Sequence, residues 1–122
     1  MTNKIIALEG VEVIAPIGYY EQERINKNTF ITDISVEIEV ADNSIDDEIR
    51  NTLDYERLSD IISCEMEKEC KLMEDAAQRI LNGVKSISAD ASRILIVIRK
   101  INPPLAAKVA NSKITLDWKH NS

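Results

Sequence analysis

Four residues of this 122-residue chain carry side chains that could transfer protons: Glu23, Tyr55, Glu74 and Lys100. Carboxylate, phenol and amine groups are common acids and bases of enzyme catalysis. All four stand near the ends of expected helices or strands, where functional sites often form. Each also has a structural explanation. Glu23 would be a solvated loop carboxylate, and Tyr55 would pack its ring at a helix start. Glu74 would favour a helix dipole, and Lys100 would keep a strand end in water.

The rare residue types exclude several other chemistries. The only histidine, His120, lies near the C-terminal end, so a Ser-His-Asp or Cys-His arrangement would depend on a segment that tends to fray. The three glycines, at positions 10, 18 and 83, are too far apart to build a phosphate-binding loop. Cys64 and Cys70 lack the spacing of a Cys-x-x-Cys pair. We therefore expect no metal site and no cofactor.

The composition predicts a single globular domain over residues 1–122, because 44% of the residues are apolar and the length is typical of one domain. The net charge of −6 argues against nucleic acid as a partner, since phosphate contacts need a positive surface. Residues 1–9 hold too short an apolar run for a signal peptide, and the longest apolar run, residues 94–98, cannot span a membrane. We expect a cytoplasmic protein with no membrane segment.

The first part of the chain predicts two paired strands. Residues 4–14 are largely apolar, with Gly10 marking a bend or bulge. Residues 29–40 end in strict alternation of apolar and polar side chains, which predicts a half-buried strand that pairs antiparallel with the first. Residues 15–28, which contain Pro16 and a polar run, are expected to form the loop between them.

The second part predicts two helices followed by two strands. Asp54 suits the N-cap of the first helix. The apolar stripe of this helix is Leu58, Ile61, Ile62, Cys64 and Met66. A second helix begins at about Leu72 and is weakened and ended by Gly83 and the serines after it. Residues 93–100 predict a deeply buried strand that a pair of prolines ends, and residues 114–118 alternate as the last strand.

The expected fold class is α+β, in the order β-β-α-α-β-β, with a four-stranded antiparallel sheet and two helices on one face. Such a sheet has one face without helices and two open edges. Open edges are usually protected or paired, so we expect oligomerisation through strands.

Five segments of the chain form an ordered set of motifs. They are Leu8-Glu9-Gly10-Val11; Gly18-Tyr19-Tyr20-Glu21-Gln22-Glu23-Arg24; Asp46-Asp47 with Asn51-Thr52-Leu53-Asp54-Tyr55; Leu72-Met73-Glu74 with Ala77-Gln78-Arg79-Ile80; and Lys100-Ile101-Asn102-Pro103-Pro104. In this order and at this spacing, the set resembles the dihydroneopterin aldolase family over nearly the whole chain.

The resemblance implies the tunnelling fold, in which subunits join edge to edge into a barrel. Two stacked tetrameric rings would give a homo-octamer, with sites between subunits. One site would then draw Glu74 and Lys100 from one chain and Tyr55 from the next. Joining edges in this way would also pair the open strands of the expected sheet.

The resemblance also implies a reaction in folate biosynthesis. The family cleaves dihydroneopterin to 6-hydroxymethyl-dihydropterin and glycolaldehyde by a retro-aldol step. The C=N bond of the dihydropterin ring accepts the electrons, so that neither a Schiff-base lysine nor a metal ion is needed. The pterin substrate would be the small-molecule partner.

The same resemblance assigns roles to the candidate residues. The catalytic set is Lys100 as the proton-transfer centre acting through water, Tyr55 as the shuttle for the side-chain proton, and Glu23 as the group that orients water or binds substrate hydroxyls. The substrate-binding set is Glu74, Met73, Leu53 and Asp54. Glu74 would accept two parallel N–H bonds from the amino-pyrimidinone edge of the ring.

Three places depart from the family pattern. Ile17 stands where many members carry histidine, Lys71 stands where asparagine is frequent, and residues 105–110 lack the usual glycines. These changes bear on loop geometry and substrate affinity more than on the reaction.

Other functions stay open at this point. The same acid and base would serve a dihydroneopterin–dihydromonapterin epimerase. The same fold without catalysis would serve a pterin- or purine-binding module, or a purely structural oligomer that pairs its edges.

Overall fold

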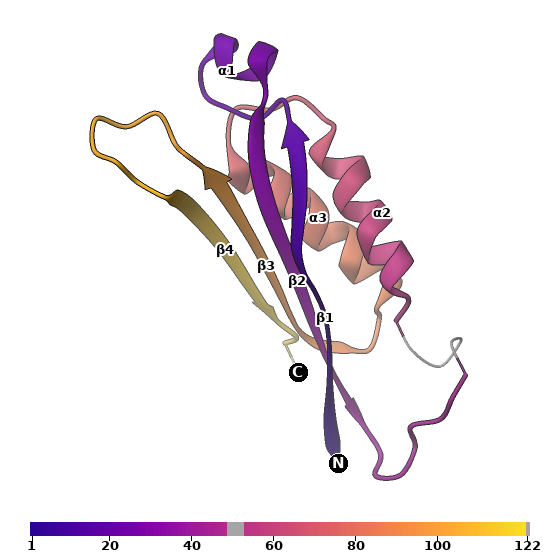
Figure 1. Cartoon of the computed structure of the whole chain (residues 1–122). Coiled ribbons are helices and arrows are strands. Elements are labelled where there is room, and N and C mark those ends of the chain that lie inside the picture. Colours follow the sequence, from indigo (N-terminus) through magenta and orange to yellow (C-terminus); the bar gives the residue numbers. More distant parts are fainter. Residues whose placement is uncertain (49–52, 122) are drawn as a thin grey trace.

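The computed structural model describes residues 1–48 and 53–121, which form one four-stranded sheet and three helices. In chain order the elements are β1 (Thr2–Ala15), α1 (Glu21–Asn26), β2 (Asn28–Val40), α2 (Tyr55–Met66), α3 (Met73–Ile87), β3 (Ala91–Ile101) and β4 (Asn111–Lys119). The strands pair antiparallel in the order β1-β2-β3-β4. Figure 1 shows α2 and α3 across one face of this sheet. The predicted α+β class and the order of its main elements are confirmed.

The sheet contributes one half of the core through alternation of its side chains. In β2, every second residue from Phe30 to Ile38 is buried. In β3, Ile94, Ile96 and Ile98 lie on the same face, because they pair with the buried positions of β2. Side chains that alternate along a strand point to opposite faces, so the intervening polar residues lie on the uncovered side.

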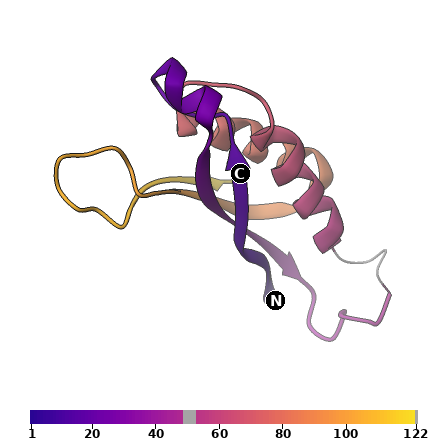
Figure 2. The same cartoon turned by 45° about the horizontal axis from the view of Figure 1, so that its top comes forward.

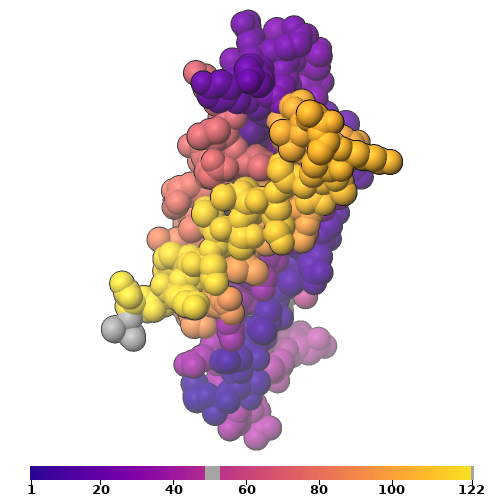
Figure 3. Space-filling view, turned by 90° about the vertical axis from the view of Figure 1, so that its left-hand side faces the viewer, coloured from indigo at the N-terminus to yellow at the C-terminus, as the bar shows by residue number. Residues whose placement is uncertain are grey.

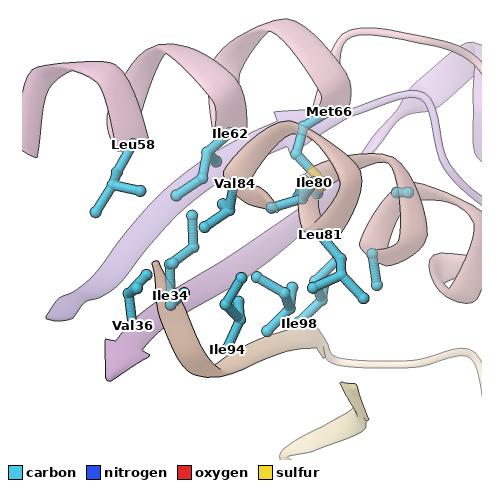
Figure 4. Packing of buried hydrophobic residues seen from close by; sticks show 14 of the residues in the cluster. Ile34, Val36, Leu58, Ile62, Met66, Ile80, Leu81, Val84, Ile94 and Ile98 are labelled. Atoms are coloured by element: carbon cyan, nitrogen blue, oxygen red, sulfur yellow. The ribbon is translucent and has the colours of Figure 1, made fainter. Parts of the chain in front are cut away.

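The two long helices contribute the other half of the core. In α2, Leu58, Ile62 and Met66 are fully buried, and their four-residue spacing puts them on one side of the helix. The buried residues of α3 follow the same kind of stripe: Ala76, Ala77, Ile80, Leu81 and Val84. Figure 4 shows side chains of both helices directed toward those of the sheet. Asp54 caps α2 as predicted, because its Oδ1 accepts a hydrogen bond from the Glu56 N–H at 2.9 Å.

A β-bulge at Gly10 interrupts the pairing of β1 with β2. The register shifts between Leu8 and Val11, and Gly10 has a φ of 71°, which glycine adopts without strain. The Gly10 N–H donates to Asp33 Oδ1 over 2.6 Å, and Arg99 Nη1 donates to Asp33 Oδ2 over 2.7 Å. One carboxylate therefore joins β1, β2 and β3 on the face without helices.

The pKa of Asp33 reflects these contacts. Burial acts to raise it, but the hydrogen bonds from Arg99 and Gly10 and the positive charge of Arg99 have the larger combined effect and lower the pKa. The aspartate is therefore held in its ionised form.

Three local predictions need correction. Residues 15–28 are not only a loop, because Glu21–Asn26 form α1, a short helix with no buried residue and hence no apolar period to reveal it. Cys64 is exposed, since it is turned about 200° away from the buried Ile62. Helix α3 runs through Gly83 to Ile87, and a Cβ at Gly83 would lie 3.0 Å from Ile61 Cγ2, so the glycine permits close packing of the two helices.

Strands β1 and β4 form the two edges of the sheet. Figure 2 shows both long helices on the same side, with the segment 102–110 extending away from the sheet. Figure 3 views the β4 edge, which runs across the surface from this segment toward the C-terminal end. No helix among the described residues is long and apolar enough to cross a membrane.

Replacing Asp33 by Asn should lower the free energy of unfolding by about 1–2 kcal/mol, because the neutral amide loses the charge-assisted bond to Arg99. Equilibrium urea unfolding at a fixed protein concentration measures this change. Glu12→Gln is the matched control, because Glu12 is exposed on the neighbouring strand. This substitution should change the free energy of unfolding by less than about 0.5 kcal/mol. Equal stability of the two variants would contradict the role given to Asp33.

Candidate active site

A pocket of about 380 Å³ lies where α1 and α3 begin and β3 ends. Four of the predicted site residues line it: Glu23, Met73, Glu74 and Lys100. The other lining residues are Ile17, Gly18, Tyr19, Tyr20, Lys71, Leu72, Pro103, Pro104, Leu105 and Ser112. The volume falls within the range of small-molecule sites. Segments from both ends of the chain therefore meet in one concave site.

Lys100 reaches the pocket because of its place in the sheet. It pairs with Phe30 of β2 and Ser112 of β4, and alternation puts it on the helix-covered face, two residues beyond the buried Ile98. Its Nζ lies 2.5 Å from Glu23 Oε1, and the two side chains are 13% and 15% exposed. Each of these poorly solvated groups therefore has a partner of opposite formal charge within hydrogen-bond distance.

Glu23 is fixed by several groups of its own loop. Its Oε2 accepts a hydrogen bond from the Tyr20 N–H at 3.1 Å. Burial acts to raise the pKa of Glu23, but the bond from Lys100, the bond from the Tyr20 backbone, the charge of Lys100 and a bond from Asn28 together lower it. Gly18 makes room for this side chain, because a Cβ there would lie 2.5 Å from Glu23 Cβ.

Glu74 is brought to the pocket by a backbone connection between distant segments. The Gly18 N–H donates to the Cys70 carbonyl at 3.1 Å, and the Cys70 N–H donates to the Pro16 carbonyl at 3.3 Å. This parallel bridge holds the chain just before α3 against the end of β1. Glu74 lies in the first turn of α3, is exposed, and forms no hydrogen bond or ion pair within the described parts of the chain. Its carboxylate is thus open to a ligand.

Tyr55, Leu53 and Asp54 lie elsewhere in the subunit and do not line this pocket. Tyr55 is the first residue of α2 and is 56% exposed. The twelve residues of α2 put its two ends about 18 Å apart, and Figure 1 shows that the helix starts far from α1. The side chain of Leu53 is buried in the core, and that of Asp54 caps α2. Asn51 and Thr52, part of the same motif, fall outside the described residues.

Sequence reasoning included several residues that shape the site in a family motif but gave them no role. Arg24 Nη1 donates to the carbonyls of Gly18 and Tyr19, each at 2.9 Å, and its Nε lies 3.0 Å from Glu69 Oε1. Tyr19 and Tyr20 form an edge-to-face pair at the pocket, with ring centroids 5.3 Å apart. The dense polar and aromatic run 19–24 carries one of the family motifs, and binding and catalytic residues are often found in such connecting segments.

The fold is shared with several solved structures. An Escherichia coli dihydroneopterin aldolase in complex with neopterin has a TM-score of 0.81 and 19% identity, over 94% of this chain and 98% of that one. A putative dihydroneopterin aldolase (FolB) from Vibrio cholerae has a TM-score of 0.83 and 20% identity, over 98% of this chain and 100% of that one. A dihydroneopterin aldolase from Burkholderia thailandensis bound to guanine has a TM-score of 0.77 and 12% identity, over 98% of this chain and 93% of that one. At these identities the likeness shows the tunnelling fold.

The sequence itself identifies the family. No curated protein matches the chain significantly. A family model described as FolB: Dihydroneopterin aldolase matches residues 6–117. The chain therefore belongs to the dihydroneopterin aldolase family.

The lowered pKa of Glu23 predicts a specific acid sensitivity. An ionised Glu23 stabilises the fold above its usual pKa of 4.5, and this contribution is lost as the pH falls through the lower pKa of the folded state. When the pH is lowered below about 4.5, the free energy of unfolding of Glu23→Gln should therefore fall less than that of the wild type. Thermal unfolding at pH values from 6 down to 3, with ~0.5-unit steps, measures this. The exposed Glu21→Gln should retain the wild-type slope, and an unchanged slope in Glu23→Gln would contradict the assignment.

Proposed function

We propose that the protein is an aldolase that cleaves dihydroneopterin to 6-hydroxymethyl-dihydropterin and glycolaldehyde in folate biosynthesis. The observation that carries this proposal is the pocket lined by the Glu23–Lys100 pair and by the carboxylate of Glu74, which no described residue pairs with. Membership of the dihydroneopterin aldolase family supports it. Neopterin and guanine, bound in two proteins of the same fold, share an amino-pyrimidinone edge, which is the type of edge a carboxylate binds.

In this proposal Glu74 binds the ring. Its two carboxylate oxygens accept the parallel N–H donors of the amino-pyrimidinone, and an unpaired acceptor in a partly enclosed pocket favours such a ligand. Met73 lines the pocket next to it and contacts the ring surface. Leu53 and Asp54 act through backbone groups, because their side chains are occupied by the core and by the helix cap.

The bond cleavage needs one base, one acid and an electron acceptor. Removal of the proton from the 2′-hydroxyl breaks the C1′–C2′ bond and releases glycolaldehyde, while the electrons enter the C6=N5 bond of the ring as an enamine. Lys100, charged beside Glu23, donates a proton to the ring nitrogen through water and stabilises the charge that develops there. Tyr55 relays the side-chain proton, accepting it as it passes its own proton to water. Protonation of the enamine at C1′ and return of the N5 proton to Lys100 then restore the C6=N5 bond and give the hydroxymethyl product.

Tyr55 reaches this site from a neighbouring subunit. Within one chain it lies at the far end of α2, whereas edge-to-edge joining of β1 and β4 in a ring would bring another copy beside the pocket. Two stacked tetrameric rings, hence an octamer, are the proposed assembly. Exposed apolar side chains around the pocket, Tyr19, Tyr20, Leu72 and Leu105, are suited to burial in such an interface.

Product analysis tests the function directly. Purified protein with dihydroneopterin should release free glycolaldehyde, and the rate should survive chelation because the substrate supplies its own electron acceptor. Lys100→Met should lower kcat by about 10²–10⁴-fold, as expected for loss of a proton-transfer group. Lys119→Met, an exposed substitution at the end of β4, serves as the matched control. A stereoisomer in place of glycolaldehyde would indicate an epimerase, and binding without turnover would indicate a pterin-binding module.

Mixing two inactive variants tests the shared site. If Tyr55→Phe and Lys100→Met subunits are unfolded and refolded together at equal amounts, sites that combine an intact Lys100 with a neighbour's intact Tyr55 form at about one quarter of positions. Activity should recover to about that fraction of the wild type. No recovery, with mixed oligomers verified by native mass spectrometry, would mean that both residues serve the site from the same chain.

A further inference from the structure

Lys71 gives the pocket a cation that the proposed reaction does not use. It lines the pocket directly before Leu72, the N-cap residue of α3, and its side chain is exposed. The pocket has one other cationic lining residue, Lys100, and Glu23 neutralises that charge at 2.5 Å. Lys71 forms no ion pair with any residue in the described part of the chain. The pocket therefore presents one ammonium group that no described residue pairs with.

The charges of the pocket define the ligand that would complement it. With Glu23 and Lys100 paired, the charged groups left for a ligand are the carboxylate of Glu74 and the ammonium of Lys71, three residues apart in sequence. A carboxylate takes the N–H donors of a pterin ring. An ammonium takes an anionic or strongly accepting group, and a lysine is a common point-charge partner of phosphate. A ligand that satisfies both has a donor edge for Glu74 and a negative charge for Lys71.

We propose that Lys71 makes this pocket selective for pterins whose side chain ends in a phosphate ester. This inference rests on the proposed pterin site and specifies its substrate class. The terminal hydroxyl of the trihydroxypropyl side chain is where such a pterin would carry its ester. The step stays balanced, because the C1′–C2′ bond breaks as before and the leaving aldehyde is glycolaldehyde phosphate, with its ester bond intact. Lys71 is thus a specificity-determining residue that contacts the part of the substrate that leaves.

Binding measurements with unreactive ligands separate this inference from catalysis. Neopterin and neopterin 3′-phosphate are fully oxidised pterins, so titration calorimetry can report their Kd values without turnover. The wild type should bind the phosphate ester at least about tenfold more tightly than neopterin, as expected for a charge-assisted contact. In Lys71→Gln the ratio of the Kd of neopterin to that of its phosphate ester should fall about tenfold. In Lys71→Arg, which keeps the charge, this ratio should stay as in the wild type.

A charge-matched control excludes general electrostatic attraction. Lys113→Gln removes the same charge from an exposed position on β4 that does not line the pocket, and it should leave the preference for the ester intact. Equal affinity of the wild type for the two pterins would overturn the inference, as would an equal loss of preference in Lys71→Gln and Lys113→Gln. If the inference about Lys71 fails but the protein still releases glycolaldehyde from dihydroneopterin, the proposed function stands without this inference. If neither pterin binds, the pterin site and this inference both fail.

Discussion

The ion pair between Glu23 and Lys100 determines the shape of the pocket, because it joins side chains 77 residues apart in sequence. Lys100 comes from the end of a buried strand, and an ammonium so little solvated requires a nearby anion. The anion comes from α1, and this short helix is held in place by the closeness of Gly18 to Glu23 and by the hydrogen bonds of Arg24. The end of β3 and α1 are therefore held together, and the hydrogen bonds between Cys70 and the segment of Pro16 and Gly18 hold the start of α3 against them.

Much of the fold could be predicted because its signals are local. Alternation in residues 29–40, the four-residue spacing of the α2 stripe and the N-cap at Asp54 each follow from the geometry of one element. The bulge at Gly10 was predicted as a bend or bulge, and the structure places it there with a positive φ. Helix α1 escaped prediction because it buries nothing, so that its order comes from contacts with other segments rather than from its own pattern.

The site was predictable in its parts but not in its arrangement. Motif resemblance singled out Glu23, Glu74 and Lys100, and the structure brings these three to one pocket. The connection that does so is a pair of backbone hydrogen bonds between Cys70 and the segment of Pro16 and Gly18, and backbone contacts between distant segments leave no mark on residue type. For the same reason, the sequence could not show that Leu53 and Asp54 have their side chains engaged in the core and the helix cap.

The bulge at Gly10 also has a geometric consequence beyond one subunit. A bulge increases the local right-handed twist of its strand, and here it lies in an edge strand, where a neighbouring sheet would continue the hydrogen-bond ladder. In a closed ring, the angle turned by each subunit decides how many subunits complete the circle. If the sheets join edge to edge as proposed, the bend fixed by Asp33 contributes to that angle. A contact within one chain would then help to set the circumference of the assembly.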